Sequence, residues 1–202
     1  MPATIFTIGY AGFTVGEFVD ALTAHRVGAV FDVRSCPFSR YRPEFDAPAI
    51  EKTLAENGIA YRNCAREFGA RQEGREFYAD EGFMVFGKFA ASVQFRDGVN
   101  MVLAVMSERV PALMCAEKDP VNCHRAILVA REFHNRGCEV VHIMPDGETL
   151  TQEDLERELL DMYFPDRRQV DLFTGWRSDD ELIADAYRLQ NEIIGWRLTE
   201  SK

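Results

Sequence analysis

The chain has 202 residues, of which 47% are hydrophobic and 28% are charged, and its net charge is −10. This composition is typical of a globular protein with one sizeable core, and the acidic balance argues against a general nucleic-acid coat protein. No apolar run approaches the roughly 20 residues that a membrane-spanning helix needs. The first residues lack a secretory-signal pattern, and five cysteines without a disulfide-framework spacing favour a reduced, cytoplasmic protein.

The first half of the chain alternates apolar runs typical of strands with amphipathic runs typical of helices. The expected order is strand, helix, strand, Pro- and Arg-rich loop, helix and strand, over residues 4–9, 14–26, 28–33, 34–46, 47–57 and 59–61. The first helix begins at Thr14, which forms a capping-box pattern with Glu17, and Gly58 closes the second. Residues 63–82 show no periodicity, which predicts a long loop or lid.

The second half continues the alternation and ends in helices. The expected order is helix, strand, helix, strand, helix and helix, over residues 83–109, 111–115, 119–136, 139–143, 151–163 and 178–196. We expect a break in the first of these helices near Asp97 and Gly98. The helix after the fourth strand is expected to begin with Asp119 as its N-cap and Pro120 in its first turn. The last helix has a broad apolar face that must be covered.

Strands that alternate with helices of about 10–15 residues predict an α/β fold. We expect a single three-layer domain, with a mainly parallel sheet of about five strands flanked by helices, and a C-terminal helical extension. We assign residues 1–150 to the α/β domain. Residues 151–202 form the extension, which packs on that domain or on a partner, so that a monomer and a homodimer both remain open.

Polar and reactive residues follow three of the expected strands. They occur at Gly9 and Tyr10, at residues 32–36, and at residues 115–125. The carboxyl ends of parallel strands share one edge of a sheet, where ligands bind in α/β proteins. We therefore expect the three segments to face one crevice, provided that their strands are neighbours.

The third segment holds the candidate catalytic residues Cys115, Glu117 and His124. At a strand end, near a helix start and the cations Lys118 and Arg125, the thiol of Cys115 is expected to have a lowered pKa that favours the thiolate. Burial as a small interior residue is the alternative interpretation of this cysteine. His124 and Glu117 are the candidate proton carriers.

The abundance of arginine predicts anion binding, because a planar guanidinium holds phosphate or carboxylate with two hydrogen bonds. The alternative is that most of these arginines form surface ion pairs. No glycine-rich phosphate loop is present, so side chains and loop amides would have to hold the anion. The candidate anion-binding residues are Gly9, Tyr10, Asp32, Arg34, Ser35, Arg40, Lys118, Asp119, Cys123 and Arg125.

The pattern of Cys115, Cys123 and His124 also invites a metal interpretation. Zinc sites usually contain more closely spaced cysteine pairs. Adjacent residues on a helix point about 100° apart, so Cys123 and His124 are not expected to share one ion. We therefore predict no metal ligands and no cofactor, with structural zinc as an alternative.

Three segments, taken together, resemble the DUF488 family, a bacterial domain of unknown function. They are TIGY near the start, FDVRSCPFSRYRPEF in the first third, and CAEKDPVNCHR. The resemblance covers roughly residues 4–150, and the matching positions are Gly9, Tyr10, Asp32, Arg34, Ser35, Pro37, Ser39, Arg40, Cys115, Glu117, Lys118, Asp119, Cys123, His124 and Arg125. The family name assigns no activity, although a DNA-repair label is sometimes attached to members. A looser likeness to rhodanese-type domains suggests sulfur transfer by analogy alone.

Two kinds of function fit these features. The leading hypothesis is a cytosolic enzyme that acts on a small anionic substrate, phosphorylated or nucleotide-like. Its anion would be bound by Arg34, Arg40, Lys118 and Arg125. The alternative is a non-catalytic module that binds a nucleotide or nucleic acid, with Tyr10 and Phe38 stacking on a base. Neither hypothesis requires a membrane.

Overall fold

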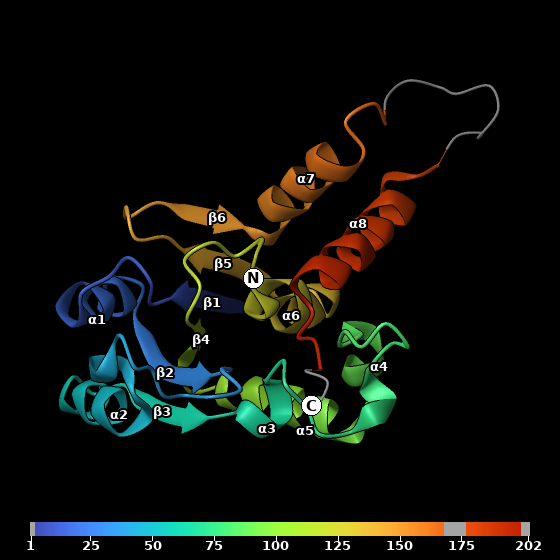
Figure 1. Ribbon diagram of the computed structural model, residues 1–202. Coiled ribbons are helices and arrows are strands. Elements are labelled where there is room, and N and C mark those ends of the chain that lie inside the picture. Colours follow the sequence, from blue (N-terminus) through green and yellow to red (C-terminus); the bar gives the residue numbers. More distant parts are fainter. Residues whose placement is uncertain (1–2, 168–176, 199–202) are drawn as a thin grey trace.

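The computed structural model describes residues 3–167 and 177–198, which form a six-stranded sheet with helices on both faces (Figure 1). The strands are β1 (Thr4–Gly9), β2 (Val27–Asp32), β3 (Ala60–Asn63), β4 (Val110–Cys115), β5 (Glu139–Ile143) and β6 (Thr149–Thr151). The α-helices are α1 (Val15–Ala24), α2 (Ala47–Glu56), α3 (Ala65–Phe68), α4 (Phe86–Ala90), α5 (Val93–Val105), α6 (Arg131–Asn135), α7 (Gln152–Tyr163) and α8 (Asp179–Ile194). Two short 3-10 helices and one π-helix complete them: η1 (Pro43–Phe45), η2 (Arg75–Phe77) and η3 (Arg125–Ala130).

The sheet has the strand order β3-β2-β4-β1-β5-β6. All neighbouring pairs are parallel except β5 and β6, so the expected α/β architecture is confirmed, with one short antiparallel strand added at the edge. Strand β4 lies between β1 and β2, and its register pairs Cys115 with Gly9 and Met114 with Asp32. The carboxyl ends of these three strands are therefore level and adjacent.

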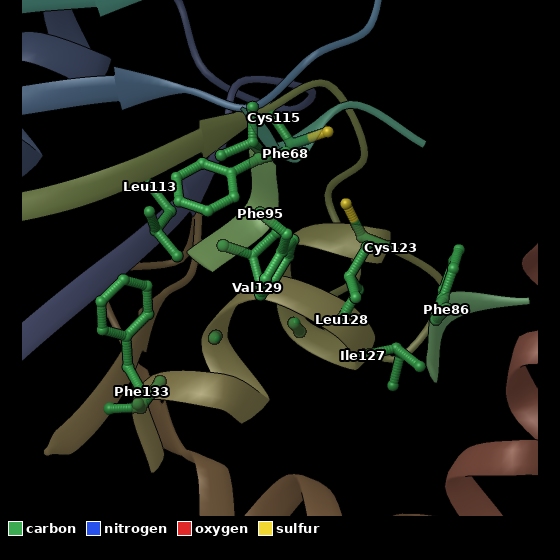
Figure 2. Packing of buried hydrophobic residues seen from close by; sticks show 14 of the residues in the cluster. Phe68, Phe86, Phe95, Leu113, Cys115, Cys123, Ile127, Leu128, Val129 and Phe133 are labelled. Carbon is green, nitrogen blue, oxygen red and sulfur yellow. The ribbon is translucent and has the colours of Figure 1, made fainter. Parts of the chain in front are cut away.

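Two apolar clusters fill the space between the sheet and its helices. Because successive strand residues point to opposite faces, Val30 packs in the cluster that contains Phe18 of α1, whereas Phe31 packs in the cluster that contains Phe95 of α5. The larger cluster surrounds η3 (Figure 2). This arrangement gives three layers, with α1 and α2 on one face of the sheet.

The expected helix starts are confirmed where the capping is local in sequence. Thr14 Oγ1 accepts from the backbone N–H of Glu17 at 3.2 Å, and the Glu17 carboxylate accepts from the N–H of Thr14 at 2.7 Å. Ser178 and Glu181 make the same reciprocal pair at the start of α8. Each box satisfies backbone donors that the first turn of a helix leaves free.

The predicted break near Asp97 and Gly98 is wrong. The helical region divides instead before Val93, because the Ser92 hydroxyl accepts from the N–H of Phe95 at 3.1 Å and starts α5 there. Gly98 lies inside α5. A Cβ on this glycine would lie 2.9 Å from the Phe68 ring, so Gly98 serves close packing rather than a break.

The helix predicted from Asp119 also begins later than expected. The Asp119 carboxylate accepts from the N–H of Val121 at 3.0 Å and from the side-chain amide of Asn122 at 2.7 Å. Residues 119–123 therefore form a turn, and Asp119 caps that turn instead of a helix. The helix that follows is the π-helix η3, which starts at Arg125 and continues into α6.

The C-terminal helices lie against the rest of the chain. Helix α7 contacts β5 and β6, and α8 contacts α7 and η3. From α8, Gln190 donates to the carbonyl of Val121, and Asn191 bonds to the backbone of Met84 and Phe86. These contacts bring the end of α8 to the edge of the sheet where β4 ends. Among the described residues, no helix combines the length and apolarity that crossing a membrane demands.

A buried histidine in β5 makes the fold sensitive to acid. His142 is fully buried, and its Nδ1 lies 2.8 Å from the Thr7 hydroxyl. Burial, together with the charge of Arg125, lowers the pKa of His142 to about 3. The folded protein therefore keeps this ring neutral at pH values where the unfolded chain protonates it.

We expect the free energy of unfolding to fall as the pH drops below about 6.5, the ordinary pKa of histidine in an unfolded chain. The contribution of His142 is complete above that pH and is lost progressively down to about pH 3, by up to about 1.4 kcal/mol per pH unit. Urea unfolding at a series of pH values measures this slope. In His142→Gln the slope should be shallower, and a slope equal to that of the wild type would contradict the assignment.

Candidate functional site

A cavity of about 420 Å³ opens at the edge of the sheet where β1, β2 and β4 end, and we call it the strand-end cavity. Its lining combines all three expected segments with the 63–82 region and the end of α8, and consists of Tyr10, Arg34, Ser35, Cys36, Phe38, Ser39, Ala70, Arg71, Cys115, Ala116, Glu117, Asn122, His124, Ile194 and Trp196. The three segments thus face one crevice, as parallel neighbouring strands require. The volume is in the range of small-molecule sites.

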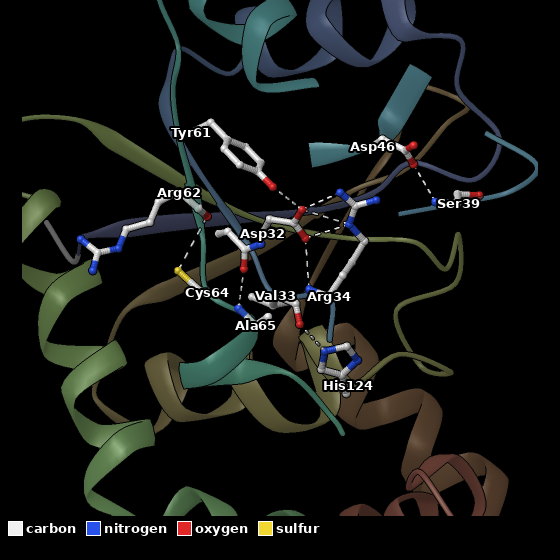
Figure 3. A network of polar contacts seen from close by, with 11 residues as sticks. Asp32, Val33, Arg34, Ser39, Asp46, Tyr61, Arg62, Cys64, Ala65 and His124 are labelled. Atoms are coloured by element: carbon white, nitrogen blue, oxygen red, sulfur yellow. Dashed lines mark hydrogen bonds and ion pairs between the residues drawn. The ribbon is translucent and has the colours of Figure 1, made fainter. Parts of the chain in front are cut away.

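Asp32 and Arg34 form a buried ion pair beside the cavity (Figure 3). Arg34 Nε lies 2.8 Å from Asp32 Oδ1 and Arg34 Nη2 lies 2.5 Å from Oδ2, and the Tyr61 hydroxyl donates to the same carboxylate at 2.7 Å. Burial alone would lower the pKa of Arg34, but Asp32 outweighs it and raises that pKa. Arg34 Nη1 is buried and has no hydrogen-bond partner within the described structure.

The aromatic residues at the cavity differ from those expected. Tyr10 is buried and stacks on Phe45 with 4.5 Å between ring centroids, so this ring is not free to stack on a base. Phe38 is 60% exposed and Trp196 is 36% exposed, and both line the cavity. The Arg71 guanidinium lies 3.5 Å from the Trp196 ring centroid. No local signal in the sequence marks Arg71 or Trp196, because long-range contacts of the 63–82 region and of the segment after α8 bring them here.

Two thiols, a carboxylate and an imidazole meet at the floor of the cavity, and we call Cys115, Glu117, Cys123 and His124 the thiol cluster. Glu117 Oε2 lies 3.0 Å from Cys115 Sγ and 3.1 Å from Cys123 Sγ. His124 Nδ1 lies 3.9 Å from Cys115 Sγ, and His124 Nε2 lies 2.9 Å from the carbonyl oxygen of Val33 (Figure 3). Figure 2 shows the two sulfur atoms together at one edge of the apolar cluster.

The expected lowering of the pKa at Cys115 is reversed. Burial raises the pKa of the Cys115 thiol, and the adjacent Cys123 raises it further. Burial also opposes a thiolate at Cys123, but the Cys115 thiol, Arg125 and His124 outweigh it and lower the pKa of Cys123. Glu117 is exposed as a residue, but its carboxyl lies against the two thiols, and this local burial, together with the charge of Cys123, raises its pKa. These directions favour a thiolate at Cys123 over one at Cys115, and Cys123 is not among the cavity-lining residues.

Arg125 does not reach the cavity as an anion-binding residue, contrary to expectation. Its side chain is fully buried and donates from Nη1 to the carbonyl of Glu117 at 2.5 Å and from Nη2 to that of Lys118 at 3.1 Å. Nε donates to the Thr7 hydroxyl at 3.2 Å. The guanidinium thus holds the loop after β4 against β1. Gly9 allows this loop to lie close to β1, since a Cβ at that position would lie 1.7 Å from the Glu117 carbonyl oxygen.

The other candidate anion-binding residues divide between the cavity and the surface. Ser35 lines the cavity, and its hydroxyl accepts from the N–H of Arg71 at 2.9 Å. Arg40, Lys118 and Asp119 are exposed and are not among the lining residues. The exposed thiol of Cys36 lines the cavity and was not among the candidate residues.

The thiol cluster also contains a set of metal-ligand atoms. Cys115 Sγ, Cys123 Sγ and one ring nitrogen of His124 all lie within 4.8 Å of one another. The expectation that Cys123 and His124 diverge is wrong, because residues 119–123 form a turn and Cys123 precedes the helix. Two thiolates and an imidazole are donors that zinc prefers.

Comparison with known proteins identifies one family. The family model described as "Domain of unknown function DUF488" matches residues 14–131, which is more than half of the chain. No curated protein and no solved structure matches the sequence. The matched region contains Asp32, Arg34 and the whole thiol cluster.

Proposed function

The chain belongs to the DUF488 family, whose description names no activity, and from its site we propose an enzyme that acts on a small anionic substrate, phosphorylated or nucleotide-like. The observation that carries this proposal is the buried Nη1 of Arg34, which has no hydrogen-bond partner in the described structure. Arg34 lines the strand-end cavity, where a substrate oxygen would supply the partner.

The ion pair with Asp32 prepares Arg34 for this role. Asp32 engages Nε and Nη2 and leaves Nη1 as the remaining donor. A buried donor without a partner costs about 1–3 kcal/mol, and a hydrogen bond to an anion recovers that cost. Ser35 and the exposed Arg71 add polar groups to the same cavity. These residues support an anionic group at this edge of the sheet.

Two exposed rings support a substrate with a planar part. Phe38 and Trp196 line the cavity, and the Arg71 guanidinium covers one face of the Trp196 ring. Aromatic rings and arginine planes are the groups on which nucleobases stack. We therefore favour a nucleotide-like molecule, with its phosphate at Arg34 and its base toward the aromatic rim.

The thiol cluster supports chemistry on the bound molecule. Burial raises the pKa of the Glu117 carboxyl, which moves it toward the range where a carboxyl group exchanges protons near neutral pH. We assign proton transfer to Glu117, because Nε2 of His124 is already engaged with the carbonyl oxygen of Val33. Burial raises the pKa of the Cys115 thiol, which favours a polar wall over a nucleophile as its role toward the substrate. All five cysteines are free thiols, which supports a reducing, cytoplasmic compartment.

The binding step is tested with inorganic phosphate and adenosine monophosphate by isothermal titration calorimetry at low salt. Arg34→Lys keeps a cation beside Asp32 but removes Nη1, so we expect about a 10- to 100-fold loss of affinity, the value of a charged hydrogen bond. Arg62→Gln removes an exposed arginine outside the cavity and should bind like the wild type. If neither probe binds the wild type, or if Arg34→Lys binds equally well, the proposal fails.

The alternative is a non-catalytic module for a nucleotide or nucleic acid, and the rim formed by Phe38, Trp196 and Arg71 favours it. Mass spectrometry of adenosine monophosphate and p-nitrophenyl phosphate after incubation separates the two. Conversion that is lost in Glu117→Gln indicates an enzyme. Binding without conversion, together with steeply salt-dependent binding of single-stranded oligonucleotides, indicates the module.

A further inference from the structure

The thiol cluster has the shape of a metal site. Zinc binds thiolate sulfur at about 2.3 Å and imidazole nitrogen at about 2.0–2.1 Å, so tetrahedral sulfur and nitrogen ligands lie about 3.6 Å apart. Cys115 Sγ and His124 Nδ1 are 3.9 Å apart, and Cys123 Sγ lies within 4.8 Å of both. We propose that Cys115, Cys123 and His124 bind a divalent zinc-type cation at the floor of the strand-end cavity.

Each ligand is held by its own local structure. Cys115 ends β4 and is paired in register with Gly9 of β1. Cys123 ends a turn whose first residue, Asp119, accepts two hydrogen bonds within it. The ligand atoms are therefore brought together by the sheet edge and by a capped turn, rather than by mobile side chains on one helix.

The orientation of His124 is the one that a metal requires. Its Nε2 lies 2.9 Å from the carbonyl oxygen of Val33, and a carbonyl can only accept, so Nε2 carries the proton. In the neutral ring, which a metal ion binds, Nδ1 then presents its lone pair on the side of Cys115. A ring nitrogen fixed in this way by a backbone carbonyl is the usual outer support of a metal-bound histidine.

The negative charge that the thiol cluster carries when its groups ionise also favours a bound cation. Both thiolates and the Glu117 carboxylate are anionic when ionised, and the buried Arg125 supplies one positive charge nearby. A divalent ion brings the formal sum of these groups to zero. Buried charges persist where they are paired or coordinate a metal. Two soft sulfur ligands with an imidazole select zinc or a similar transition metal over magnesium or calcium.

The bound ion would have a coordination position open to the cavity. Cys115 and His124 line the cavity, whereas Cys123 lies beneath it, and Glu117 stands beside both sulfurs. Three protein ligands with one open position is the arrangement of catalytic zinc sites, in contrast to the closed set of four in structural sites. This inference does not depend on the proposed substrate, because the metal is measured without it.

The test is a titration of the full, metal-stripped chain with Co²⁺ in a thiol-free reductant. We expect one equivalent to bind, with a sulfur-to-cobalt charge-transfer band in the near ultraviolet and a strong tetrahedral band in the visible, and Zn²⁺ to displace it. Cys123→Ser and His124→Asn should weaken binding more than about 100-fold, since outer supports alone are worth about 10–100-fold. Cys36→Ser removes an exposed thiol of the same cavity and should bind normally.

The outcomes that overturn the inference are specific. Reduced wild type without the sulfur-to-cobalt band, or Cys123→Ser with an unchanged band, would do so. If circular dichroism shows that Cys123→Ser or His124→Asn does not fold, the Co²⁺ titration of the other variant still tests the site. A disulfide between Cys115 and Cys123 that resists the reductant would also overturn the inference, because the two sulfurs would then be bonded to each other and could not bind a metal ion. Arg34→Lys should keep normal Co²⁺ binding, so failure of the anion site and failure of the metal site are distinguishable.

Discussion

Asp32→Ala is expected to lower the free energy of unfolding by about 3–5 kcal/mol, the usual loss when one partner of a buried ion pair is removed. Asp32 is fully buried and accepts hydrogen bonds from Arg34 and Tyr61. Without this carboxylate, the buried guanidinium has no compensating charge and the Tyr61 hydroxyl loses its acceptor. Urea unfolding monitored by circular dichroism measures the change.

The matched control is the exposed pair between Arg42 and Glu44. Its nitrogen–oxygen distance is 2.6 Å, and its side chains are 31% and 42% exposed. Water screens such a pair, so Glu44→Ala should leave the free energy of unfolding nearly unchanged. If Asp32→Ala and Glu44→Ala lowered the free energy of unfolding equally, burial would not make the pair of Asp32 with Arg34 more important to stability than the exposed pair. The double variant Asp32→Leu with Arg34→Met should recover much of the stability while lacking the proposed anion site.

Gly9→Ala is the second substitution for which we expect a large effect. The added Cβ would lie 1.7 Å from the carbonyl oxygen of Glu117, which Arg125 holds in place by a 2.5 Å hydrogen bond. Neither backbone can yield without breaking the β1–β4 register or the loop. We expect a loss of at least about 3 kcal/mol, at the upper end of the cost of overpacking.

Gly16→Ala provides the comparison for this prediction. Gly16 lies in α1, and a Cβ there meets nothing within 4 Å. Alanine should stabilise the helix by about 0.5–1 kcal/mol, because it loses less backbone freedom on folding. Urea unfolding of both variants gives the contrast. In Gly9→Ala the displaced loop should also weaken Co²⁺ binding, whereas Gly16→Ala should bind Co²⁺ like the wild type. A Gly9→Ala variant as stable as the wild type would contradict the close approach of Gly9 to the Glu117 carbonyl oxygen.

Features that depend on neighbours in sequence were predictable. The capping boxes at Thr14 and Ser178 are formed by residues three positions apart, so a short window of sequence contains all of their atoms. The alternation of strands and helices predicted a parallel sheet, and parallel strands place their carboxyl ends at one edge. That rule predicted the meeting of Arg34 with Cys115 and His124 on the condition that their strands are neighbours, and the strand order of the structure meets this condition.

One wrong prediction, the helix start at Asp119, arose because this residue has two local solutions. Asp119 can cap a helix or a turn, because its carboxylate accepts from N–H groups two or three residues ahead in both. The turn forms here, and Gln190 of α8 reinforces it by donating to the carbonyl of Val121. That distant contact also decides the chemistry, since Cys123 in a turn can join His124 at one ion, whereas on a helix it would diverge.

The sequence by itself determined the architecture, the edge of the sheet that carries the site, and the types of reactive group gathered there, because these follow from periodicity and local hydrogen bonding. Only the tertiary structure decided what each group does. Burial turned Arg125 into a support for the loop, stacked Tyr10 on Phe45, and left one nitrogen of Arg34 without a partner. These outcomes depend on which distant side chains exclude water from a group, and that is a property of the packed chain rather than of any segment within it.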